Sequence, residues 1–220
     1  MGQVVDTTLE RSRLIDHFKR AYQIIVGLAI TLACTKLFPN GAFEIPKDTS
    51  FWLFCTFFIT IVPIFHGGDR SLDIKYLNKQ PTGFWGRTGF LWDYYILLIT
   101  AILFVKIAQA IPSQTPTGQA IPGVAQVPPT APDHFYQWMA IMLFFDVAVL
   151  LVGCLKGDLW RTYVKWIVIN FIFAFICLSA KSIPECWPVF SPNTVAALVF
   201  AIAFLRTILD YVVGKDFMFP

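Results

Sequence analysis

Residues 135–180 decide the fold: FYQWMAIMLFFDVAVLLVGCL occupies 135–155, KGDL occupies 156–159, and WRTYVKWIVINFIFAFICLSA occupies 160–180. Each flanking segment has about the 20 apolar residues that a helix needs to span roughly 30 Å of hydrocarbon. The link between them is too short for anything but an antiparallel turn. The stretch therefore predicts a transmembrane helical hairpin.

Four more apolar segments of similar length lie at 22–38, 50–66, 90–110 and 193–213. With 56% hydrophobic and 14% charged residues, the chain is too apolar for an ordinary water-soluble domain. We therefore predict an all-α fold, a polytopic integral membrane protein with six transmembrane helices.

The predicted domains are a cytoplasmic N-terminal segment at 1–21, a six-helix transmembrane domain at 22–213 and a cytoplasmic tail at 214–220. The first apolar segment carries Lys36 rather than a small-residue cleavage site, so we expect a permanent span rather than a removed signal. Segment 1–21 sets Leu9, Ile15 and Phe18 among charges, which permits a short interfacial helix. A helical extension of the first span fits the same pattern.

The lysines and arginines orient the six spans. Thirteen of the 17 fall on one side when the N-terminus is taken as cytoplasmic, and they alternate correctly across every connection. The opposite side receives only Lys36, Lys47, Lys106 and Lys181, and its longest loop, 111–134, has no lysine or arginine. Because short cytoplasmic loops are enriched in these residues, we predict that both termini are cytoplasmic.

Several function classes lack support in the sequence. The net charge of +3 comes from cations beside apolar spans, which predicts no nucleic-acid partner. The patterns of zinc proteases, serine hydrolases and P-loop ATPases are absent, as are Cys-x-x-Cys pairs. Only His66 of three histidines lies at membrane depth, too few ligands for a bis-histidine haem. We expect no catalytic residue, no metal site and no cofactor.

Ionisable residues gather in the cytoplasmic half of the predicted bundle. Asp146 lies about 17 Å from the outer end of its span, at about 1.5 Å per residue, and Arg206 lies at a similar depth. Asp210 shares a helix face with Arg206, and Asp93 lies one turn inside the third span. Charges at this depth must face protein or water rather than lipid. Asp146, Arg206 and Asp210 form either an ion network that locks the fourth and sixth helices, or the lining of a water-accessible path or binding pocket with Asp146 as its ion or proton site.

A second candidate site follows the second span. We predict a cytoplasmic turn there, made of His66, Gly67, Gly68, Asp69 and Arg70. It is either a structural turn with charges at the membrane interface, or a turn whose backbone amides and Arg70 bind a lipid headgroup or a partner. One histidine and one aspartate make a weak metal signal. Pro63 precedes the turn and should free a backbone carbonyl that a cavity or a neighbouring helix must satisfy.

Three functions fit these features. The first is a channel or carrier for an ion or small solute that uses the polar cluster. The second is a non-catalytic subunit or effector that acts by oligomerisation or by binding another protein. The third, a lipid-headgroup enzyme with His66, Asp69 and Asp93 as acid–base groups, lacks the aspartate-rich metal motif of a phosphotransferase and ranks last. We expect a multi-pass protein of the bacterial cytoplasmic membrane, surrounded by lipid, that forms a homo-oligomer or joins a membrane complex.

The charge asymmetry makes a topology prediction. Cysteines introduced at 114–126 should react with a membrane-impermeant thiol reagent from outside, because this loop lies in the region without cations. A cysteine introduced at Asn78 should react only after the membrane is permeabilised. The opposite labelling pattern would overturn the orientation.

Overall fold

The described part of the chain is entirely helical in the computed structural model, which covers residues 7–38, 48–77, 83–113, 132–155 and 160–219. Six helices are long and apolar enough to cross a membrane, in agreement with the six predicted spans. The elements are α1 (Thr7–Leu37), α2 (Thr49–Leu72), the π-helix η1 (Asp73–Leu77), α3 (Gly83–Ala110), α4 (Pro132–Leu155), α5 (Trp160–Cys186), α6 (Pro192–Val213) and α7 (Lys215–Met218).

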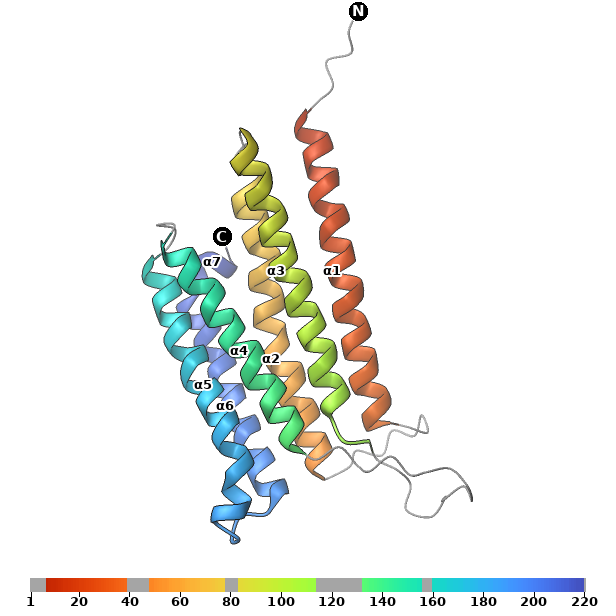
Figure 1. The fold of residues 1–220 in the computed structure, drawn as a ribbon, viewed down its shortest axis with the longest axis vertical. Coiled ribbons are helices and arrows are strands. Elements are labelled where there is room, and N and C mark those ends of the chain that lie inside the picture. The colour runs from red at the N-terminus through yellow and green to blue at the C-terminus, as the bar shows by residue number, and fades with distance from the viewer. Residues whose placement is uncertain (1–6, 39–47, 78–82, 114–131, 156–159, 220) are drawn as a thin grey trace, which may run out of the picture.

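The six long helices run alternately in opposite directions and bring both termini to the same end of the bundle (Figure 1). Each packs on two neighbours, in the cyclic order α1, α2, α6, α5, α4, α3, and α2 also touches α3 across the ring. The hairpin predicted from residues 135–180 is present as the closely packed pair α4 and α5. That the shared end is cytoplasmic stays a prediction from the charge pattern.

Helix α1 is longer than the predicted first span because it continues without a break from Thr7 to Leu37. Its N-terminal part is held against α2 and η1 by Lys19, whose Nζ lies 2.9 Å from carboxylate oxygens of both Asp69 and Asp73. Ile15 is fully buried one turn earlier. Of the two alternatives for this segment, the structure therefore has the helical extension and not a separate interfacial helix.

The predicted turn at 66–70 is wrong, because α2 continues through these residues to Leu72 and passes into η1. Glycine disfavours a helix by about 1 kcal/mol, but tertiary contacts override this preference. A Cβ on Gly68 would lie only 2.6 Å from the Leu97 side chain, so the glycine permits close approach of α3. The Asp69 and Asp73 contacts to Lys19 hold the continued helix from its other side.

Pro63 lies inside α2 and cannot donate the backbone hydrogen bond that would normally satisfy the carbonyl of Ile59. The hydroxyl of Thr207 on α6 donates to that carbonyl oxygen at 3.0 Å. A neighbouring helix thus satisfies the group that the proline leaves free, as expected from the sequence. The contact also ties α2 to α6 beside the polar cluster.

Local contacts define both ends of α6. The hydroxyl of Ser191 caps its N-terminus by accepting from the Thr194 backbone at 3.1 Å, and Pro192 occupies the first turn. At the other end, residues 215–218 of the predicted tail form α7, which packs on α2 and α6. Phe217 and Met218 are buried there, so the tail is part of the bundle.

The proline contact predicts an energetic coupling between two substitutions. Thr207→Val should lower the free energy of unfolding by about 0.5–1.5 kcal/mol, because the Ile59 carbonyl loses its donor. In a Pro63→Ala background the amide of the introduced alanine can donate to Ile59 within the helix, so Thr207→Val should then cost much less. Melting temperatures of the four proteins in detergent measure this cycle. Equal losses in the two backgrounds would contradict the assigned role of Thr207.

Candidate functional site: a charged cavity inside the helix ring

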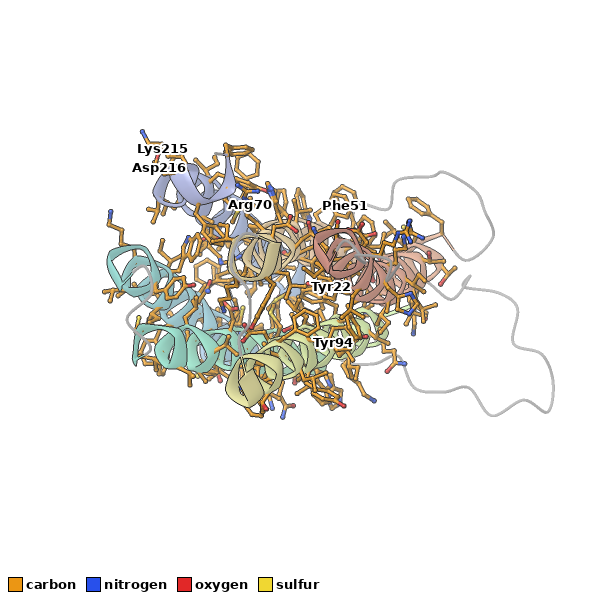
Figure 2. The ribbon with its side chains drawn as sticks, turned by 90° about the horizontal axis from the view of Figure 1, so that it is seen from above. Tyr22, Phe51, Arg70, Tyr94, Lys215 and Asp216 are labelled. Carbon is orange, nitrogen blue, oxygen red and sulfur yellow. The ribbon has the colours of Figure 1, made fainter. Side chains whose placement is uncertain are left out.

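A partly open cavity of about 140 Å³ lies inside the ring. All its lining helices contribute from the half nearest the termini, an end seen from above in Figure 2. Five acidic or basic side chains line it, namely Lys75 of η1, Asp93 of α3, Asp146 of α4, and Arg206 and Asp210 of α6. The four residues expected from the sequence to form a polar cluster are therefore in one wall.

Arg206 is the most buried cation of this wall, with a relative exposure of 4%. Its Nη2 lies 3.0 Å from an Asp210 carboxylate oxygen, one helical turn away. Its Nε and Nη2 both donate to the Asn170 side-chain oxygen, at 3.0 and 2.6 Å. The guanidinium carbon also lies 5.9 Å from the centre of the Phe173 ring, within cation–π range.

Asp146 is linked to Arg206 through Asn170 rather than by direct contact. The Asn170 side-chain nitrogen donates to an Asp146 carboxylate oxygen at 2.5 Å while its oxygen accepts from Arg206. The four residues thus form a hydrogen-bonded chain, Asp146–Asn170–Arg206–Asp210, across α4, α5 and α6. We call this chain the polar relay.

Asn170 was not among the residues predicted from the sequence. Its signal was available, since an amide at the middle of an apolar span must find a polar partner. The residues predicted for the cluster were all charged, whereas the structure places this neutral amide between Asp146 and Arg206. The amide bridges the two charged groups by hydrogen bonds, and Asp146 is half-buried at the cavity wall.

A second ion pair lies nearer the end of the bundle. Lys75 Nζ is 3.0 Å from the Asp93 carboxylate, which also accepts a hydrogen bond from the Tyr76 hydroxyl at 2.7 Å. The Lys75 side chain keeps 34% of its surface exposed, so solvent screens this pair far more than the relay. Asp93 therefore has a cation as its partner, whereas Asp146 has the neutral amide of Asn170.

Two relay atoms are buried without a hydrogen-bond partner among the described residues, Nη1 of Arg206 and one carboxylate oxygen of Asp210. Both residues line the cavity. A buried donor or acceptor left unpaired costs about 1–3 kcal/mol, and more when charged. Two residues of the wall therefore carry one unsatisfied donor and one unsatisfied acceptor.

The residues of the second predicted site have separate surroundings. Gly67 and Gly68 line the cavity, whereas the ring centre of His66 lies 6.1 Å from that of Tyr211 and 5.8 Å from that of Phe219. Asp69 pairs with Lys19, and Arg70 lies in the last turn of α2, at the terminal end of the bundle (Figure 2). The described cavity wall thus contains Asp93 but neither His66 nor Asp69. The three residues that the enzyme hypothesis used as acid–base groups therefore do not share this cavity. Headgroup or partner binding by these residues stays a prediction.

Comparison with protein-family models, with curated proteins and with solved structures gave no match to this chain. The function is therefore argued from the cavity and its charges.

Proposed function

We propose that the protein is a carrier for a small polar solute, and that the charged cavity is its binding chamber. The observation that carries this proposal is the polar relay in the wall of a partly open cavity near the middle of an apolar bundle. Ionised groups at membrane depth are costly and commonly mark substrate or ion pathways. A cavity of about 140 Å³ has room for a solute of a few heavy atoms.

The packing of the other half of the bundle favours a carrier over an open channel. Large side chains that are fully buried fill the ring beyond the cavity, including Phe57, Phe104, Phe135, Met139 and Phe173. Close-packed interiors leave few voids larger than a water molecule. Passage through this half therefore needs a rearrangement of helices, which is how a carrier exposes one site to the two sides in turn.

The chemistry of the wall indicates the class of solute. It combines carboxylates, a guanidinium, an amide and the hydroxyls of Ser71 and Thr100 with apolar side chains. Such a site orients a ligand by a few polar contacts and excludes water elsewhere. We propose a small solute with both a donor and an acceptor group, taken from the side on which the termini lie.

Two valines on α4 give a matched test of the chamber. Val149 lines the cavity, whereas Val152, three residues later, is exposed at the surface of the bundle. Purified protein in liposomes should take up at least one of labelled glycine, urea, choline and rubidium above protein-free vesicles. Val149→Phe should reduce that uptake at least tenfold by filling the chamber, and Val152→Phe should leave it within twofold of the native rate.

Two results would contradict the proposal. Uptake absent for every probe in correctly folded, reconstituted protein would instead favour the alternative of a non-catalytic subunit or effector. Uptake retained in Val149→Phe would place the solute path outside the cavity.

A further inference from the structure

The charges of the cavity wall do not balance. Its described lining holds three carboxylates, Asp93, Asp146 and Asp210, against two cations, Lys75 and Arg206. When all five are ionised, one negative charge is in excess. An uncompensated charge in a low-dielectric interior costs several kcal/mol, so the wall favours the uptake of one positive charge.

The excess charge belongs to Asp146. Asp93 is paired with Lys75 at 3.0 Å, and Asp210 is paired with Arg206 at 3.0 Å. Within the described residues, Asp146 has the neutral amide of Asn170 as its hydrogen-bonding partner and no cation within ion-pair distance. It also keeps accessible surface at the cavity, so an ion from solution can reach it.

A second observation points to the same place. Asp210 lines the same cavity and is more than nine-tenths buried, and one of its carboxylate oxygens has no hydrogen-bond donor among the described residues. Thr100 also lines the cavity, and its hydroxyl already donates to the Ile96 carbonyl at 3.0 Å, which leaves its oxygen free to accept. Oxygen acceptors are the ligands that hard monovalent cations prefer.

We propose that Asp146 reversibly takes up one monovalent positive charge, a proton or an alkali-metal cation, and that this charge couples to solute binding in the cavity. The inference rests on the proposed carrier function and names its coupling charge. Uptake of this charge neutralises the wall. The chamber then carries no net charge when it is exposed through the apolar half of the bundle. A wall that has taken up this charge then crosses more readily than the wall with one excess negative charge.

Several groups set the electrostatic environment of Asp146, and all must be kept in view when pH is varied. They come from five elements packed around it: Tyr22 of α1, Lys75 of η1, Asp93 of α3, Tyr163 and Asn170 of α5, and Arg206 and Asp210 of α6. Figure 2 shows Tyr22 between α1 and α3, on the inner side of the ring. Asp146→Asn changes only the carboxylate and preserves the shape of the site.

The test uses full-length protein in lipid nanodiscs. Its melting temperature is measured in sodium, potassium and N-methylglucamine salts at equal ionic strength, and infrared difference spectra across pH report a protonated carboxyl. We expect either a rise of at least about 3 °C specific to one alkali cation, or a carboxyl band that titrates. Either signal should vanish in Asp146→Asn and persist in Asp216→Asn, a carboxylate at the outer rim in Figure 2.

Asp210→Asn provides a second variant that does not depend on the folding of Asp146→Asn. It leaves Asp146 in place but balances the wall, so the cation signal should be lost there as well, and the titration of the Asp146 carboxyl band should move from its native pH. Native protein with neither signal, or a signal that survives in Asp146→Asn, would overturn the proposal. Solute uptake without either signal would contradict the proposed coupling to Asp146 and leave the carrier function standing. Either signal without solute uptake would contradict the carrier function and leave the charge uptake by Asp146 standing.

Discussion

The guanidinium of Arg206 is the constraint on which the inner half of this bundle depends. A cation with 4% exposure in an apolar bundle must be surrounded by acceptors, and the structure supplies them from two helices, Asp210 on α6 and Asn170 on α5. Asn170 in turn uses its amide nitrogen to hold Asp146 on α4. Three helices are thus positioned by one side chain, and the same network gives the cavity its polarity.

Residues of α2 also line that cavity. Pro63 and Gly68 face it from α2, where one breaks the hydrogen-bond ladder and the other lets α3 approach closely. Thr207, adjacent to Arg206, satisfies the carbonyl that Pro63 frees. Polar groups that a soluble protein would leave to water are satisfied here by neighbouring helices, because lipid offers no partners.

Much of this was predictable from the sequence, and the failures share a cause. The length of the apolar segments predicted the six long helices, and a rise of about 1.5 Å per residue predicted a similar depth for Asp146 and Arg206. Depth alone does not tell which side chain stands between two charges, so Asn170 was missed. Local glycine propensity suggested a turn at 66–70, but contacts of Lys19 and Leu97 from other helices decide that segment. Both errors concern partners that are remote in sequence.

The stability of the relay tests most directly whether Arg206 organises the bundle. Arg206→Leu leaves two carboxylates, the buried Asp210 and the half-buried Asp146, without the cation of their network, and should lower the free energy of unfolding by about 3–5 kcal/mol. Adding Asp210→Leu removes one of them and should recover much of the loss in melting temperature. A native melting temperature for Arg206→Leu, or strictly additive effects of the two changes, would contradict the account.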